Sequence, residues 1–256
     1  ARRSLLERGV RQDLADARSR ARAEALRTRV VVADGAMGTM IQAQDPTLED
    51  YEGLEGCNEI LNVSPPAITA AGPAAYLEVG VDAIETNTFG ANWSNLSDYD
   101  IDDRIRELAA AGARIARERA DAHATADHPR WVLGSMGPGT KLPSLGHTTY
   151  AHLRDTFAEQ AAGLLEGGAD AILVETSQDL LQAKAAVTGS RNAMRDVGRE
   201  VPVIVQVTVE TTGTMLMGSE IGAALPTLQA LTDDDVVNHS ATLANQSTPP
   251  QRHPTR

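Results

Sequence analysis

The strongest constraint on the fold is a regular alternation, from residue 30 onward, of short apolar runs with longer amphipathic stretches. The runs are typical of strands buried on both faces, and the Ala-rich stretches between them are typical of helices that cover a sheet. We expect strands at 30–33, 82–86, 131–134, 170–174 and 202–207, and helices at 101–124, 149–166, 178–197 and 218–231. Strand–helix–strand repetition predicts a parallel sheet in an α/β fold.

A short internal repeat sets the spacing of these units. Each copy has a Gly that can close a helix in the left-handed conformation, an Asp that opens a strand, and a Glu at the strand's C-terminal end. The copies run from Gly80 to Thr86 and from Gly168 to Thr176. The two Gly lie 88 positions apart with one strand between them, which gives βα units of about 44 residues. This spacing favours a (β/α)8 barrel over an open doubly wound sheet.

Composition divides the chain into three segments. Residues 1–29 contain nine Arg against four acidic residues, and their apolar residues recur at helical spacing. We interpret this segment as a basic, solvated helical arm. Residues 30–231 contain the alternation. Residues 232–256 have almost no large apolar side chains and several Pro, so we expect a disordered tail. Only about five of the eight barrel strands are predicted, so the barrel is expected to be incomplete.

Charge and cysteine content exclude several classes of protein. The net charge of −12 disfavours nucleic-acid binding, because that function needs a basic surface. A single cysteine, Cys57, cannot form an intrachain disulfide or a thiolate cluster. No apolar run has the length of a membrane span, and the first residues do not resemble a signal peptide. We therefore expect a cytoplasmic protein with neither nucleic acid nor membrane as a partner.

Candidate functional residues follow the predicted strands, because barrels place their sites on those loops. Asp34 precedes a turn of small residues whose backbone N–H groups could face an anion, and Glu175 ends a buried strand and needs a cation. Asp34 could equally be a helix cap and Glu175 part of a salt bridge. If both face a ligand, an ammonium near the carboxylates and a carboxylate near the turn would suit an amino-acid zwitterion.

Five strings, in order, resemble the homocysteine-binding domain of cobalamin-dependent methionine synthases. They are Asp-Gly-Ala-Met-Gly-Thr at 34–39, Leu-Glu-Gly-Cys-Asn-Glu-Ile-Leu-Asn at 54–62, Glu-Thr-Asn-Thr-Phe-Gly at 85–90, Gly-Ser-Met-Gly-Pro-Gly-Thr-Lys-Leu-Pro at 134–143 and Thr-Val-Glu-Thr-Thr-Gly-Thr-Met-Leu-Met-Gly-Ser-Glu at 208–220. The resemblance covers about residues 28–231. It implies a (β/α)8 barrel that transfers a methyl group to the homocysteine thiol to give methionine.

The resemblance also implies a site. Asp34 and Glu175 would bind the homocysteine ammonium, and the turn formed by Gly35, Ala36 and Met37 would bind its carboxylate. The remaining implied pocket residues are Asn87, Thr88 and Ser135. In this family three Cys thiolates hold a zinc ion that binds the substrate sulfur, and the methyl group comes from methyltetrahydrofolate through methylcobalamin, both on downstream domains.

One departure from the family pattern limits this expectation. The family's zinc cysteines end the sixth and eighth strands, whereas this sequence loses the pattern at Leu231, and Cys57 is not one of them. A truncated or frame-shifted coding sequence would explain the change, as would genuine divergence. We expect this chain alone to bind neither zinc nor cobalamin and to be inactive. Two alternatives stay open: a metal-free barrel enzyme acting on a small amino acid, and a non-catalytic remnant.

Overall fold

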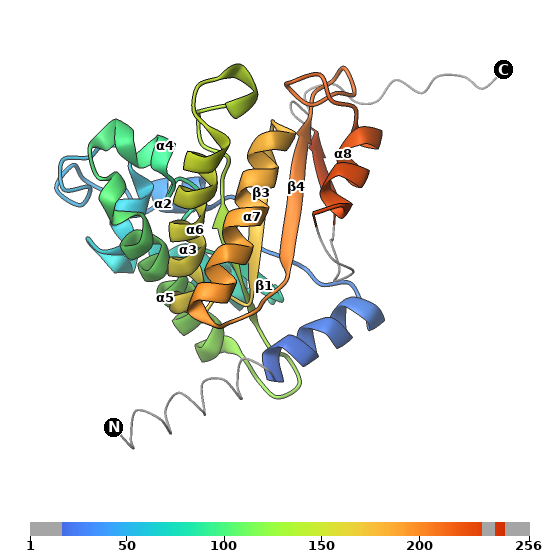
Figure 1. Ribbon diagram of the computed structural model, residues 1–256. Helices are drawn as coiled ribbons and strands as arrows, with labels where there is room; N and C mark the ends of the chain where they lie inside the picture. The colour runs from blue at the N-terminus through green and yellow to red at the C-terminus, as the bar shows by residue number, and fades with distance from the viewer. Residues whose placement is uncertain (1–16, 232–238, 244–256) are drawn as a thin grey trace.

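The computed structural model describes residues 17–231 and 239–243 and shows a five-stranded, all-parallel sheet with strands in chain order (Figure 1). The strands are β1 (Ala83–Glu85), β2 (Trp131–Met136), β3 (Ala171–Ser177), β4 (Val203–Val209) and β5 (His239–Leu243). Each strand pairs with the next one in the chain, and a helix connects most neighbours, as the alternation predicted.

The helices agree closely with the amphipathic stretches of the sequence. The α-helices are α2 (Met37–Gln42), α3 (Pro66–Glu78), α4 (Trp93–Leu96), α5 (Ile105–His123), α6 (Tyr150–Gly167), α7 (Leu180–Val197) and α8 (Ile221–Gln229). Short 3-10 helices are η1 (Asn58–Asn62), η2 (Ser97–Tyr99), η3 (Asp102–Arg104) and η4 (Pro143–Leu145). A further helix covers residues 17–28, and we call it the N-terminal helix.

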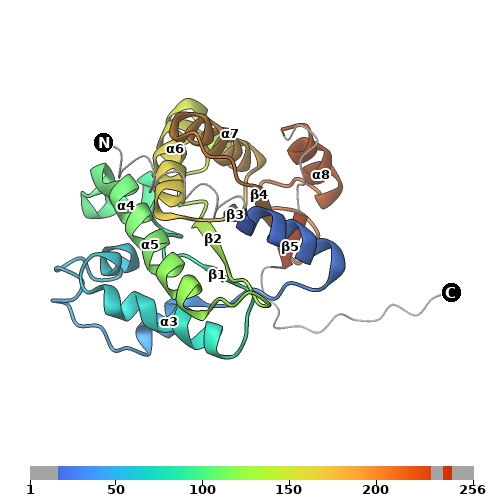
Figure 2. The ribbon, with the colours of Figure 1, turned by 90° about the horizontal axis from the view of Figure 1, so that it is seen from below.

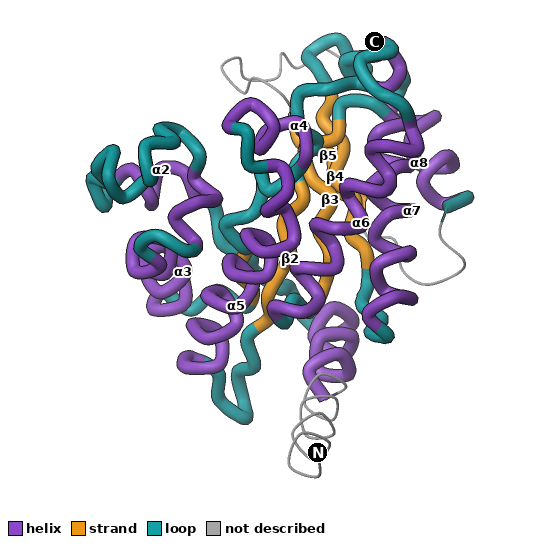
Figure 3. Tube along the Cα trace, turned by 60° about the vertical axis from the view of Figure 1, so that its left-hand side comes forward, coloured by secondary structure: helices purple, strands orange, loops and turns teal. Residues whose placement is uncertain are grey.

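The large helices pack in a row on one face of the sheet, where they form the main core (Figure 3). Alternate strand residues such as Val132, Ile172 and Val205 point into this core and meet the Ala-rich faces of α5, α6 and α7. Small residues allow close approach: a Cβ on Gly189 of α7 would lie 2.5 Å from the carbonyl oxygen of Arg154 on α6. The opposite face of the sheet is therefore left for the remaining alternate residues.

The observed strands differ from the expected ones in two places. The run at 30–33 forms only one bridge residue, Ala33, beside Ala83 of β1, and Val30 and Val32 are exposed. Residues 239–243, expected to belong to a disordered tail, form β5 and pair in parallel with β4. Backbone hydrogen bonding to β4 thus overrides a weak local strand pattern. The rest of the predicted tail and the first 16 residues of the predicted arm lie outside the described residues.

The internal repeat builds the same contact twice at the N-terminal ends of the strands. Asp82 accepts a hydrogen bond from the backbone N–H of Val32 at 2.9 Å, and Asp170 accepts one from Val132 at 2.9 Å. Each Asp thereby joins its own strand to the preceding segment. Gly80 and Gly168, with φ of 97° and 104°, end the preceding helices in the left-handed conformation that the sequence predicted.

The arginines of the N-terminal segment complete these contacts, so the arm is not merely solvated. Arg29 forms two hydrogen bonds of 2.8 Å with Asp82, and Arg18 forms one of 2.8 Å with Asp170. Arg22 is 7% exposed and donates to the backbone carbonyl of Asp170. In the view from below, the N-terminal helix, drawn in blue, lies in front of the strands (Figure 2). Three arginines in the described part of the arm thus bond to the strand ends.

Candidate functional site

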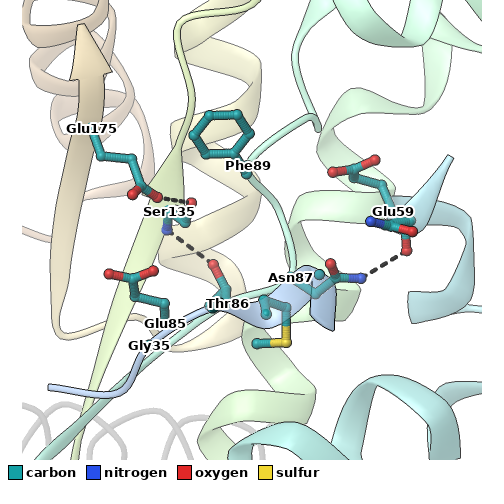
Figure 4. A pocket seen from close by; sticks show the side chains of 12 residues that line it. Gly35, Glu59, Glu85, Thr86, Asn87, Phe89, Ser135 and Glu175 are labelled. Carbon is teal, nitrogen blue, oxygen red and sulfur yellow. Dashed lines mark hydrogen bonds between the residues drawn. The ribbon is translucent and has the colours of Figure 1, made fainter. Parts of the chain in front are cut away.

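A pocket of about 450 Å³ opens near the C-terminal ends of β1, β2 and β3, at the edge where the parallel strands end (Figure 4). It is lined by Gly35, Ala36, Met37, Gly38, Asn58, Glu59, Glu85, Thr86, Asn87, Phe89, Ser135 and Glu175. This is the edge of a parallel α/β sheet where ligands generally bind.

Six of the eight predicted site residues line this pocket. They are Gly35, Ala36, Met37, Asn87, Ser135 and Glu175. The turn at 35–37 leads into α2, and no side chain caps that helix at Ala36. The two other predicted residues, Asp34 and Thr88, lie next to the pocket without forming its wall.

Asp34 is held next to the pocket by the backbone of β1. Both of its carboxylate oxygens lie 3.0 Å from the N–H of Glu85, which donates to them. Burial raises the pKa of Asp34 to about 7, against the opposing effect of this hydrogen bond, and the nearby charge of Glu175 adds to the rise. Asp34 is thus an acidic group whose protonation changes near neutral pH.

Thr88 is completely buried, and its side chain bonds to the backbone of β2 instead of lining the pocket. Its hydroxyl donates to the carbonyl oxygen of Ser135 at 2.7 Å, and it also contacts the hydroxyl of Thr86 at 2.5 Å. Thr86 in turn accepts a 3.0 Å hydrogen bond from the N–H of Ser135. The two threonines therefore fix the backbone from which the Ser135 hydroxyl enters the pocket.

One side of the pocket is strongly acidic. Glu85 and Glu175 occupy the same side in Figure 4, and the hydroxyl of Ser135 donates to Glu175. Burial, together with the nearby charges of Glu175 and Asp34, raises the pKa of Glu85 to about 8. Burial also raises the pKa of Glu175, which the Ser135 hydrogen bond partly opposes. No Lys or Arg is found among the described residues of the pocket wall.

The opposite side of the pocket is polar and rigid. Asn87 donates to the carbonyl oxygen of Asn58 at 2.7 Å, and Glu59 accepts a 2.7 Å hydrogen bond from the N–H of Gly90. Burial raises the pKa of Glu59. Phe89, 42% exposed, forms the upper part of the wall in Figure 4.

Sequence reasoning missed six lining residues: Gly38, Asn58, Glu59, Glu85, Thr86 and Phe89. The internal repeat could have identified Glu85, because it ends its strand as Glu175 does in the second copy. The wall formed by Asn58 and Glu59 comes from a 3-10 helix, and no strand-end rule points to it.

The described residues do not fit a zinc site. No three His, Cys, Asp or Glu side chains form a group suited to holding a metal ion within residues 17–231, and the cysteine there, Cys57, is buried and free. Burial raises the pKa of Cys57 to about 11, so its thiol is protonated at neutral pH. We therefore derive no chemistry through zinc for this chain.

The class of protein follows from comparison with known families. The family model described as homocysteine S-methyltransferase matches residues 31–252, and the chain belongs to this family. The matched range extends beyond Leu231, the residue at which the resemblance was predicted to end. No helix in the described part of the chain has the length and apolar character needed to cross a membrane.

Within that family, the chain is clearly related to methionine synthases. It is 58% identical to the methionine synthase of Mycobacterium tuberculosis over 233 residues, which cover 91% of this chain and 20% of that protein. It is 60% identical to that of Mycobacterium leprae over 219 residues, covering 86% of this chain and 18% of that protein. The chain thus spans about a fifth of the length of these relatives.

Solved structures show the same fold at low sequence identity. The apo form of the homocysteine methyltransferase MmuM from Escherichia coli matches with a TM-score of 0.62 at 16% identity, covering 84% of this chain and 73% of that one. Its metallated form matches with a TM-score of 0.58 at 17% identity, covering 86% of this chain and 85% of that one. The α/β sheet described above is therefore of this barrel type, with five strands described.

Proposed function

We propose that this chain is the homocysteine-binding part of a methionine synthase and that it recognises the amino-acid end of the substrate. Glu175 and Asp34 would bind the ammonium group, while the turn of Gly35, Ala36 and Met37 would bind the carboxylate. The observation that carries the proposal is the acidic side of the pocket, where no described Lys or Arg lies among the lining residues. Partly buried carboxylates need a cation, and a ligand ammonium supplies one.

Ser135, Asn87 and Thr88 have supporting roles in this proposal. Ser135 orients Glu175 by donating to it. Asn87, fixed by its hydrogen bond to Asn58, presents a rigid polar wall beside the turn. Thr88 acts through Ser135, because it holds the backbone of that residue in place. These contacts reduce the number of side chains that must be ordered when a ligand binds.

We further propose that this chain by itself does not transfer a methyl group. In the full enzyme the methyl group would pass from methyltetrahydrofolate through methylcobalamin to homocysteine, with folate and cobalamin domains as partners. A free thiol has a pKa of about 8.5, so most of it is protonated at neutral pH and is a poor nucleophile. The described residues offer no donor set that would hold a thiolate-activating metal.

Calorimetric titration of the full chain tests the proposed recognition. We expect homocysteine and methionine to bind alike, with a Kd of about a millimolar, since a small zwitterion offers few contacts. N-acetylmethionine, which lacks the ammonium, should not bind. Glu175→Gln should weaken both amino acids, whereas Glu118→Gln, on the exposed side of α5, should not. A strong preference for homocysteine over methionine, or turnover with methylcobalamin, would contradict the proposal.

A further inference from the structure

The three carboxyl groups on the acidic side of the pocket differ in their partners. Asp34 accepts the backbone N–H of Glu85, and Glu175 accepts the hydroxyl of Ser135. The carboxyl of Glu85 has no hydrogen bond or ion pair among the described residues, although it lines the pocket. Glu85 is thus the group of the three that only a ligand or solvent can satisfy.

We propose that Glu85 holds a proton while the pocket is empty and releases it to solvent when a ligand ammonium binds. This inference rests on the proposed function, since it requires an amino acid as the ligand. The balance is simple: the carboxylic acid becomes a carboxylate, one proton passes to the buffer, and the ligand ammonium keeps its own protons.

Burial of Glu85 and the charges around it explain why the empty pocket would retain a proton. Glu175, on β3, lies on the same side of the pocket as Glu85, and Glu59 lies across the pocket. Asp34, in the segment before α2, accepts the backbone N–H of Glu85. Every one of these groups is acidic, and no described Lys, Arg or His lines the pocket. Like charges this close disfavour simultaneous ionisation. An ammonium placed among them reverses the local field, so the carboxylate form of Glu85 becomes favourable.

This coupling sets the sign of the pH dependence. If a carboxyl group must lose its proton when the amino acid binds, the affinity for the amino acid rises with pH. The rise stops once this group is already ionised in the empty pocket. The pKa of Glu85 is raised to about 8. If one proton is released, the Kd for an amino acid should fall by up to about 50-fold between about pH 6 and about pH 8.

Proton release can be measured directly by calorimetry. The full chain is titrated with methionine, whose thioether does not titrate, in two buffers of different ionisation enthalpy, phosphate and Tris, at several pH values. The dependence of the heat on the buffer gives the number of protons released. We expect close to one proton near neutral pH for the unmodified chain.

Two variants assign the proton. Glu85→Gln removes this titrating group, so it should release fewer protons on binding methionine and show a shallower pH profile than the unmodified chain. Glu85→Asp retains a carboxyl group and should retain the release. The matched control Glu118→Gln, an exposed position on α5, should behave as the unmodified chain does. Circular dichroism confirms that each variant is folded.

The possible outcomes separate this inference from the proposed function. Methionine binding without proton release in the unmodified chain overturns the inference and leaves the proposed function standing. Unchanged proton release in folded Glu85→Gln also overturns it and moves the proton to Asp34 or Glu175. Absence of methionine binding at every pH overturns the proposed function itself.

Discussion

Replacing Gly189 by Ala tests whether the helix row depends on backbone contact between α6 and α7. The new Cβ would lie 2.5 Å from the carbonyl oxygen of Arg154 and 3.0 Å from the backbone nitrogen of Ala158. Both are backbone atoms, so a side-chain rotation cannot relieve the contact and the helices must separate. Overpacking of this kind costs about 1–3 kcal/mol, and better helix propensity returns at most about 1 kcal/mol. A 2.5 Å contact with backbone falls in the upper part of this cost range, so we expect a net loss of about 1–2 kcal/mol.

A matched substitution makes the comparison decisive. Gly222 is exposed in the first turn of α8, and a Cβ added there would meet no atom within 4 Å, so Gly222→Ala should raise stability by up to about 1 kcal/mol. Urea unfolding followed by circular dichroism measures both. With a typical m-value, Gly189→Ala should lower the midpoint by about 0.5 M at unchanged m. A Gly189→Ala chain as stable as the unmodified one would refute the close-packing argument.

Three further measurements test the ends of the sheet and the pocket. Asp82→Asn should make the free energy of unfolding depend less on pH in the acid range. The hydrogen bond from Arg29 holds the pKa of Asp82 below its usual range. The ionised Asp82 therefore stabilises the fold above its unfolded pKa, and this contribution is lost as pH falls through the folded pKa. Metal analysis of the purified chain should show less than one equivalent of zinc, and a full equivalent lost in Cys57→Ser would contradict the site assignment. Gly137→Ala should weaken methionine binding, because the added Cβ would lie 2.6 Å from the carbonyl oxygen of Phe89 and displace this lining residue. Unchanged affinity for methionine would show that the position of Phe89 does not matter for binding.

Much of the sheet could be predicted from apolar patterning, and its two errors have a common cause. The strands at 82–86, 131–134, 170–174 and 202–207 are confirmed within a few residues as β1 to β4. The run at 30–33 is more apolar than the residues of β5, yet β5 has five paired residues and the run has one bridge. Whether a segment forms a strand at the border of a sheet depends on its backbone partner, and single-sequence patterning does not reveal that partner.

Residue type and position after a strand predicted several site residues, but they did not predict which side chains come together in the pocket. Asp34 and Glu175 stood out as carboxylates after strands, and the structure places both near the pocket. Glu85 has the same pattern, but its importance comes from lying beside Glu175 once β1, β2 and β3 are in register. Thr88 is polar and follows a strand, yet it points into the protein and bonds to the backbone of Ser135. Side-chain direction at strand ends requires the three-dimensional register.

The internal repeat also separates carboxylates that stabilise the fold from those available to a ligand. At the N-terminal ends of the strands, Arg29 neutralises Asp82 and lowers its pKa. At the C-terminal ends, Glu85 has no basic partner among the described residues, and burial beside other acids raises its pKa. One motif thus contributes an ionised, paired acid at one edge and an unpaired acid at the other. Since a fold gains nothing from an unpaired, partly buried acid, the edge that carries Glu85 is where a cationic ligand is expected.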